Sequence, residues 1–253
     1  MSQKDTLVFD ADDTLLATIW TYDVAQALFF EFIYKTFPGR APSFHDVYER
    51  FFEIDAELAK SWGIRRGRWA ESMVCLYKEI CKYVEDRFGE DLYCDGDARK
   101  IRQIGDMPFH YSNHFWLPNV KTVLRILGGR YTLCLLTSYD TNLFPERSKY
   151  LGFNEFFGDR IRCIDHKKTA EDFIAVSDWS SSADGKWYAI GNGESDILPA
   201  LTVGDNWHGI YIPHRNTSPF FNRGGKKASF DAEPITHHRV KNIQRFDQIL
   251  EHL

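Results

Sequence analysis

The chain has 253 residues, of which 43% are hydrophobic and 26% are charged, and its net charge at pH 7 is −5. This length and composition are typical of a soluble globular protein with one or two domains, and the acidic balance argues against a general nucleic-acid partner, which would favour a basic face. The N-terminus shows no signal peptide, and no apolar run approaches the ~20 residues that span a bilayer, so we expect a cytoplasmic protein with no membrane partner. The five cysteines form no C-x-x-C pair, and we expect them to be reduced thiols.

The first informative segment is a short apolar run that ends in acidic residues. Leu7-Val8-Phe9 is followed by Asp10, Asp12 and Asp13. Side chains alternate between the two faces of a strand, so Asp10 and Asp12 project to the same side of the strand end. Carboxylates this close repel one another unless a cation or a proton holds them together, and ligand sites in parallel α/β sheets lie at the carboxyl ends of the strands. We therefore expect a bound metal and carboxylate chemistry here.

The segment from about 20 to 110 contains no convincing strand and is predicted to be an all-helical unit. Apolar residues at helical spacing indicate four helices, which cover Tyr22–Phe37, Phe44 to a stop at Gly63, Trp69–Phe88 and Asp97–Ile104.

Three arginines, Arg65, Arg66 and Arg68, cluster in the turn between the second and third of these helices. Guanidinium groups pair well with carboxylates and phosphates. The cluster is interpreted either as a loop that binds the anionic part of a substrate or as a solvated turn.

From Pro118 onward the pattern changes to strands that alternate with helices. The expected strands are Tyr131–Leu136, Ile161–Ile164, Trp187–Ile190 and Gly209–Ile212, and the expected helices are Val120–Leu127, Leu143–Leu151, Ala170–Val176, Ile197–Val203 and Val240–Leu250. Surface loops are expected from Trp179 to Lys186 and from His214 to Ser229. The alternation predicts a parallel sheet with crossover helices. The first strand belongs to this sheet, and the helical unit is inserted after it.

Polar residues stand at four successive strand ends of the predicted sheet. They are Asp10 and Asp12, Thr137 and Ser138, Lys167 and Lys168, and Asn192 and Asp196. The carboxyl ends of parallel strands meet at one edge of a sheet, so these side chains are expected to form one site. One or two polar strand ends would be ordinary for an α/β protein, whereas four in order indicate a functional site.

The residue types at these strand ends fit the transfer of a phosphoryl group through a carboxylate. Asp10 is placed to attack phosphorus and form an aspartyl-phosphate, and Asp12 can protonate the leaving oxygen and later activate water. Thr137 can donate a hydrogen bond to a phosphoryl oxygen, and one of the two lysines can neutralise the developing charge. Asp196 completes an oxygen-rich site that suits Mg²⁺, and Ser138 can offer its backbone N–H to phosphate.

Four segments of the chain resemble the motifs of the haloacid dehalogenase-like hydrolase superfamily, on its phosphatase branch. Asp10-Ala-Asp-Asp-Thr-Leu15 matches the D-x-D-x-T nucleophile motif, and Leu135-Leu136-Thr137 matches the hydrophobic strand that ends in Thr or Ser. Lys168-Thr169-Ala-Glu171 resembles the lysine motif, which favours Lys168 over its neighbour, and Gly191-Asn-Gly-Glu-Ser-Asp196 resembles the acidic motif. The four motifs occur in order over nearly the whole chain.

The resemblance implies an α/β fold, in which residues 1–18 and 111–253 form a Rossmann-like parallel-sheet core and residues 19–110 form an inserted all-helical cap domain. It also implies a Mg²⁺-dependent phosphomonoester hydrolase that acts on a small phosphorylated metabolite, with Asp10, Asp12, Asp196 and Asn192 at the metal. The acidic motif of the family commonly begins Gly-Asp, whereas here Gly191 is followed by Asn192. This departure removes one negative charge from the expected metal site.

Other functions share some of these features. A phosphomutase of the same superfamily has every motif, and a non-catalytic protein that binds a phosphorylated ligand is compatible with Asn192. A dehalogenase would need Asp10 but neither Asp12 nor a metal. A signalling receiver also gathers acids at strand ends, but its phospho-acceptor lies on a later strand.

Overall fold

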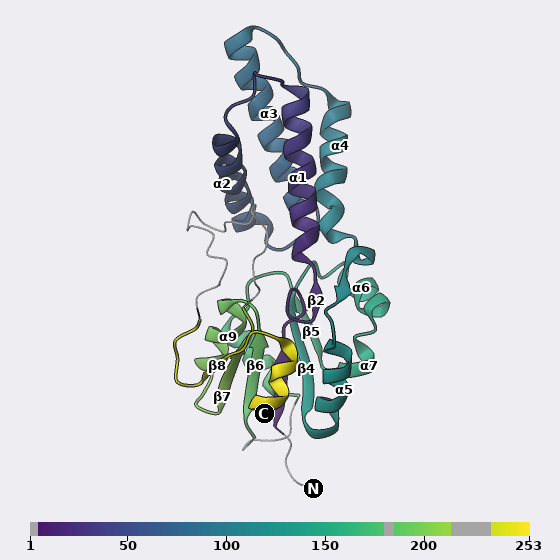
Figure 1. Ribbon diagram of the computed structural model, residues 1–253, viewed down its shortest axis with the longest axis vertical. Coiled ribbons are helices and arrows are strands. Elements are labelled where there is room, and N and C mark those ends of the chain that lie inside the picture. The colour runs from purple at the N-terminus through teal and green to yellow at the C-terminus, as the bar shows by residue number, and fades with distance from the viewer. Residues whose placement is uncertain (1–4, 180–184, 214–233) are drawn as a thin grey trace. The chain divides into compact units, whose positions relative to one another are not determined.

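The computed structural model describes residues 5–179, 185–213 and 234–253 and divides them into two compact units (Figure 1). The first, called here the α/β unit, contains the described residues up to 18 and from 114 onward, and the second, called the helical unit, contains residues 19–113. All five cysteines are free thiols. Within the described ranges, no helix combines the length and the apolar character needed to cross a membrane.

The α/β unit is built on a six-stranded sheet in which all neighbouring strands are parallel. The strand order is β5 (Ile161–Ile164), β4 (Thr132–Ser138), β1 (Thr6–Phe9), β6 (Trp187–Gly191), β7 (Trp207–Tyr211) and β8 (Val240–Asn242). β1 lies inside the sheet, where Val8 pairs with Cys134 on one side and with Ala189 on the other. The carboxyl ends of all six strands therefore share one edge. The predicted Rossmann-like parallel core is confirmed.

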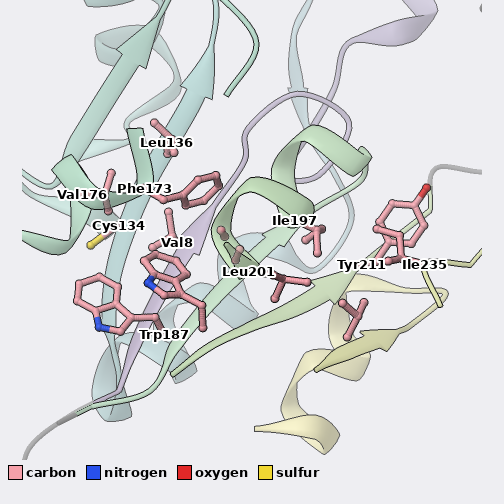
Figure 2. Packing of buried hydrophobic residues seen from close by; sticks show 14 of the residues in the cluster. Val8, Cys134, Leu136, Phe173, Val176, Trp187, Ile197, Leu201, Tyr211 and Ile235 are labelled. Atoms are coloured by element: carbon pink, nitrogen blue, oxygen red, sulfur yellow. The ribbon is translucent and has the colours of Figure 1, made fainter. Parts of the chain in front are cut away.

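One face of the sheet is covered by α8 (Ala170–Ser177) and α9 (Glu194–Leu201). Figure 2 shows Phe173 of α8 and Ile197 of α9 among the buried side chains of this face, together with Val8 and Trp187 of the sheet. The rings of Trp187 and Trp207 stack with centroids 5.1 Å apart, and Phe173 meets Trp207 edge-on at 5.4 Å. Such aromatic pairs bury large apolar areas and fix the helices against the strands.

The opposite face of the sheet carries the side chains of the intervening strand residues. Phe9 follows Val8 in β1, and its ring lies 6.1 Å from Phe157 in α7 (Asn154–Phe157) and 6.0 Å from Phe246 in η3 (Phe246–Gln248). α5 (Val120–Arg130) contacts both α7 and η3 and belongs to the same layer. Burial on both faces explains why the central strands are continuous apolar runs.

The helical unit consists of four helices and two short 3₁₀ turns. They are α1 (Ile19–Thr36), α2 (Phe44–Trp62), α3 (Arg68–Phe88), α4 (Asp95–Asp106), η1 (Met107–Phe109) and η2 (Tyr111–Asn113). Ser43 caps α2 by accepting the backbone N–H of Asp46 at 3.2 Å, as its side chain favours. Gly63 and Gly89 end α2 and α3 with φ of 65° and 73°, where a residue without Cβ is least strained. The four predicted helices are confirmed.

Aromatic side chains fill the interior of the helical unit. Phe51 is fully buried, and its ring lies 4.7 Å from Trp69 in a T-shaped arrangement and 6.1 Å from Phe29. α3 and α4 approach so closely that a Cβ on Gly105 would lie 2.3 Å from the Cα of Ala70. The unit therefore has a hydrophobic core of its own.

The predicted helix from Val240 to Leu250 is wrong. Its first residues form β8, in which Val240 pairs with Gly209 of β7, and only η3 and the short α10 (Ile249–His252) follow. Apolar residues at Val240, Ile243 and Phe246 imitate helical spacing. Pairing with β7 satisfies the backbone groups of both segments, so the tertiary context overrides the local pattern.

Smaller differences lie at element ends and at one unpredicted pair of strands. α5 continues through the two glycines at 128 and 129, and α9 begins three residues before the expected Ile197. β2 (Leu16–Ala17) and β3 (Phe115–Trp116) form a two-stranded antiparallel sheet. The expected loop from His214 to Ser229 lies outside the described residues, as do residues 180–184 of the other expected loop.

Candidate active site

A buried lysine joins two carboxylates at the carboxyl ends of the central strands. Asp10 directly follows β1, and its backbone N–H donates to the carbonyl of Ile190 at 2.8 Å, which fixes it beside β6. The Nζ of Lys168 donates to Oδ1 of Asp10 at 2.5 Å and to Oδ1 of Asp196 at 2.6 Å. The side chains of all three residues are at most 10% exposed. The structure therefore brings together residues that are as many as 186 positions apart along the chain.

The environment of this cluster changes its acid–base properties. Burial, followed by the charge of Asp196, raises the pKa of Asp10 to about 7, although Lys168 acts in the opposite direction. For Lys168, burial alone would lower the pKa, but the adjacent carboxylates of Asp10 and Asp196 raise it above its usual value. The two carboxylates therefore favour the charged form of Lys168, whereas burial and Asp196 favour the protonated form of Asp10, which Lys168 opposes.

The conformation of the loop before α8 buries Lys168 and leaves Lys167 exposed. Asp172, one turn into α8, accepts hydrogen bonds from the backbone N–H and the hydroxyl of Thr169 and contacts His166 Nε2 at 3.1 Å. Burial would raise the pKa of Asp172, but these hydrogen bonds lower it. With the loop held in this way, Lys168 points inward and is 5% exposed, whereas Lys167 is exposed.

Asp196 is positioned by the turn that begins α9. Its Oδ2 accepts the backbone N–H of Gly193 at 2.8 Å, which leaves Oδ1 for Lys168. Gly191 is required here because a Cβ at this position would lie 2.2 Å from the Cβ of Asp196. The glycine-rich sequence of this turn thus allows the carboxylate to approach the end of β6.

Asp12 and Asp13 have separate partners. Asp12 is held by the guanidinium of Arg147 in α6 (Phe144–Leu151), with Nη1 3.2 Å from Oδ2 and Nη2 in contact with Oδ1. Asp13 has a positive φ of 56°, and its carboxylate accepts hydrogen bonds from the backbone N–H and the hydroxyl of Thr18. These bonds stabilise a backbone conformation that is uncommon for a residue other than glycine. Asp13 is thus part of the turn after β1.

Asn192 contacts the turn that follows β1 through Thr14. The hydroxyl of Thr14 donates to Oδ1 of Asn192 at 2.9 Å, and Thr14 itself is buried. Because that oxygen retains a second lone pair, it can still bind a cation.

Thr137 and Ser138 end β4 with different surroundings. The hydroxyl of Thr137 is fully buried and has no hydrogen-bond partner among the described residues. The hydroxyl of Ser138 donates to the carbonyl of His166 at 2.8 Å, so it supports the loop that carries Lys168. An unpaired buried hydroxyl is costly, which makes Thr137 a natural donor to a ligand oxygen.

The three arginines belong to the helical unit and do not form one group. Arg68 is paired with Asp55 at 2.5 Å, and both side chains are only 15% exposed. Arg66 pairs with Asp106 at 3.2 Å on the surface, and Arg65 is exposed. Arg68 therefore stabilises the contact between α2 and α3, and the exposed members of the cluster are Arg65 and Arg66.

The residues at the strand ends fit a hard divalent cation. Oxygens of Asp10 and Asp196 converge on one positive charge, the ammonium of Lys168, and carboxylate oxygens, like the amide oxygen of Asn192, are donor types that suit Mg²⁺. Across the described ranges, no three His, Cys, Asp or Glu side chains stand close enough to hold an ion. The side chain of Asp12, which the sequence placed at the metal, is instead bound to Arg147.

Arg147 is the site residue that the sequence patterns did not identify. The buried residues of α6 are Phe144, Arg147, Ser148 and Leu151. This spacing marks the inner face of a helix, and an arginine in such a position is unusual. That irregularity is the signal from which the residue could have been found.

Comparison with known proteins supports the fold. No protein-family model and no curated sequence matches the chain. A haloacid dehalogenase-like family hydrolase from Xanthomonas campestris is 19% identical, with a TM-score of 0.67 over 98% of this chain and 91% of its own. A putative HAD-hydrolase from Bacillus subtilis bound to magnesium is 16% identical, with a TM-score of 0.58 over 99% and 98% of the two chains.

A third similar structure belongs to a protein named for one reaction. A 2-haloacid dehalogenase from Pseudomonas syringae pv. Tomato is 18% identical, with a TM-score of 0.54 over 98% of this chain and 97% of its own. The chain therefore has the haloacid dehalogenase-like fold, as its motifs suggested. Because one fold can support many unrelated functions, the activity has to be argued from the site.

Proposed function

We propose that this protein is a Mg²⁺-dependent phosphomonoester hydrolase that acts on a small phosphorylated metabolite through an aspartyl-phosphate. The observation that carries the proposal is the buried cluster in which Lys168 contacts both Asp10 and Asp196. A carboxylate nucleophile that meets a dianionic phosphate needs fixed positive charge beside it. Lys168 supplies one such charge, and the oxygen donors around it suit a second.

In the first step, an oxygen of Asp10 attacks phosphorus, and the bond between phosphorus and the leaving oxygen breaks. Asp12 gives a proton to that oxygen, so the product leaves as an alcohol. The hydroxyl of Thr137, which is buried and unpaired, donates to a phosphoryl oxygen. Lys168 stabilises the charge on the transferring group.

In the second step, water attacks the phosphorus of the aspartyl-phosphate. Asp12 accepts a proton from that water, and Asp10 is released together with inorganic phosphate. Asp10, Asp196 and Asn192 would hold Mg²⁺, which when bound would reduce the repulsion between substrate and nucleophile. The positive charge of Lys168 favours the ionised form of Asp10, which the next attack requires.

The proposal is tested with purified protein and a panel of phosphate esters that includes 4-nitrophenyl phosphate. We expect release of inorganic phosphate that stops on chelation and returns with Mg²⁺ but returns little with Ca²⁺, whose larger and more flexible coordination fits an octahedral site poorly. Asp10→Asn is the matched control, because its amide cannot attack phosphorus.

Each rival function has its own result in this experiment. Isomerised phosphate esters without phosphate release would identify a phosphomutase, and halide release from a 2-haloacid would identify a dehalogenase. Binding without turnover of any ester would identify a phospho-ligand binding protein. Full activity of Asp10→Asn would disprove the covalent mechanism.

A further inference from the structure

A fully buried arginine stands directly behind the proposed acid–base residue. The side chain of Arg147 is 0% exposed, whereas that of its partner Asp12 is 29% exposed. Both carboxylate oxygens of Asp12 are engaged by the guanidinium, one by each Nη. The arginine is thus the buried member of the pair, and part of the Asp12 side chain stays accessible.

Arg147 is itself held in a fixed position. Its guanidinium carbon lies 4.0 Å from the centre of the Tyr139 ring, which is within the range of a cation–π interaction. Tyr139 is 4% exposed and is anchored by its backbone N–H to the carbonyl of Ile164 at 2.8 Å. The turn before α6 is fixed by Asp140, whose Oδ1 accepts the backbone N–H of Asn142 at 2.9 Å.

A guanidinium in this place has a considerable desolvation cost. It occupies a helix position whose neighbours on the same face are Phe144 and Leu151, where an apolar residue would pack without that cost. A planar guanidinium that grips both oxygens fixes the plane of the carboxylate as well as its position. An apolar residue or a lysine cannot do this.

From this geometry we infer that Arg147 is a positioning residue, which acts through Asp12 by fixing the orientation of the carboxylate that transfers protons. The inference rests on the proposed function. A misplacement of about 1 Å in a reacting group can cost ~10²-fold in rate. Without the guanidinium, Asp12 rotates freely at the surface of the site and meets the leaving oxygen only part of the time.

The consequence differs between substrates. An alkyl phosphate has a strongly basic leaving oxygen that needs a proton as its bond to phosphorus breaks. 4-Nitrophenyl phosphate has a stable leaving anion that needs little help. Loss of orientation at Asp12 therefore lowers kcat/KM for alkyl phosphates far more than for the nitrophenyl ester, whereas general structural damage lowers both alike.

The test measures kcat/KM in the presence of Mg²⁺ for a series of esters from 4-nitrophenyl phosphate to simple alkyl phosphates. The proteins compared are the wild type, Arg147→Met, Arg147→Lys, Asp12→Asn and the double variant Asp12→Asn with Arg147→Met. We expect Arg147→Met to lose ~10²-fold on the alkyl phosphates and only a few-fold on the nitrophenyl ester. Arg147→Lys keeps the positive charge but cannot bind both carboxylate oxygens in a bidentate way, so it should lose less activity on the alkyl phosphates than Arg147→Met. The double variant behaves like Asp12→Asn alone, because both changes remove the same function.

Arg160→Met serves as the matched structural control. Arg160 also belongs to the α/β unit, and its Nε donates to the carbonyl of Leu133 at 2.9 Å, away from Asp12. Its replacement should leave the dependence on the leaving group unchanged. Circular dichroism and thermal melting establish that each variant is folded. If Arg147→Met does not fold, Arg147→Lys carries the comparison.

Three results would overturn the inference. They are an equal loss on all esters by the Arg147 variants, an additive loss in the double variant, and the same change in leaving-group dependence in Arg160→Met. If the wild type hydrolyses no phosphate ester, the proposed function fails and this inference fails with it. If the wild type is active but the Arg147 variants keep its leaving-group dependence, only the inference fails.

Discussion

The ion pairs of the two units differ in how far they are withdrawn from solvent, and the more buried pair Arg68–Asp55 of the helical unit is still 15% exposed on each side. In the helical unit, Arg50 and Glu79 form an ion pair at 2.8 Å whose side chains are 39% and 47% exposed. In the α/β unit, Lys168 and Asp10 form a pair at 2.5 Å whose side chains are 2% and 9% exposed. Exposed pairs contribute little to stability, and buried pairs carry a large desolvation cost. The more deeply buried of these pairs therefore lies at the proposed active site, in the α/β unit.

The interiors of the two units differ in the same sense. The ring of Phe51 packs against those of Trp69 and Phe29 in the helical unit. In the α/β unit, Arg147 and Lys168 occupy interior positions next to carboxylates. We expect mutations in the helical interior to change stability first, and mutations of the buried charges in the α/β unit to change activity first.

The largest effect should follow from a cavity in the helical unit. Phe51→Ala should destabilise the protein by about 3–5 kcal/mol, because the ring is fully buried and its neighbours cannot close the space. Arg50→Ala on the same helix should cost at most about 1 kcal/mol. Urea denaturation followed by circular dichroism measures both. Similar losses in the two variants would remove the contrast between interior and surface in this unit.

The next effect concerns the two adjacent lysines of the α/β unit. Lys168→Met should lower kcat/KM for a phosphate ester by ~10²–10³-fold, the usual result of removing one group that stabilises transferred charge. Lys167→Met is the matched control and should stay near the wild type, because Lys167 is exposed. A larger loss in Lys167→Met would show that the functional lysine is one residue earlier.

The sequence predicts most of the architecture because the patterns involved are local. Apolar spacing locates the four helices of the helical unit, and the buried strands are continuous apolar runs that end in polar residues. The helix predicted from Val240 failed because the segment pairs with β7, a contact that no local spacing encodes. The edge strand could be found only after the rest of the sheet was known.

The same reasoning explains what could be foreseen at the site. The four polar strand ends predict that Asp10, Lys168 and Asp196 come together, since parallel strands end at one edge. The bond between Thr14 and Asn192 joins residues 178 positions apart and depends on side-chain geometry that the pattern does not contain. Arg147 was missed because a charged residue on a helix is ordinarily at the surface, and only its place among Phe144 and Leu151 distinguishes it.

A smaller effect should separate two residues at the proposed metal position. Asp196→Ala should weaken Mg²⁺ binding by at least roughly 10–100-fold, a range known for the loss of metal-supporting groups. Asn192→Ala should weaken it less, because Asn192 is neutral and its Oδ1 already accepts from Thr14. Calorimetric titration of each folded variant with Mg²⁺ measures the difference without turnover. The reverse ranking would make Asn192 the principal ligand.

The smallest effect is expected at the exposed arginines of the helical unit. Arg66 and Asp106 are 45% and 26% exposed, so the double change Arg65→Ala with Arg66→Ala should cost at most about 1 kcal/mol of stability. If these arginines bind a second anionic group of the substrate, the double variant should lose kcat/KM on a phosphorylated metabolite that carries a carboxylate. The loss should be up to about fivefold, which corresponds to about 1 kcal/mol, and 4-nitrophenyl phosphate should show no loss.

Arg68→Ala is the contrasting variant, because its pair with Asp55 is only 15% exposed on each side. It should lower stability more and affect both substrates alike. An equal loss on both substrates in the double variant, or none on either, would leave Arg65 and Arg66 as a solvated turn and place the choice of substrate elsewhere.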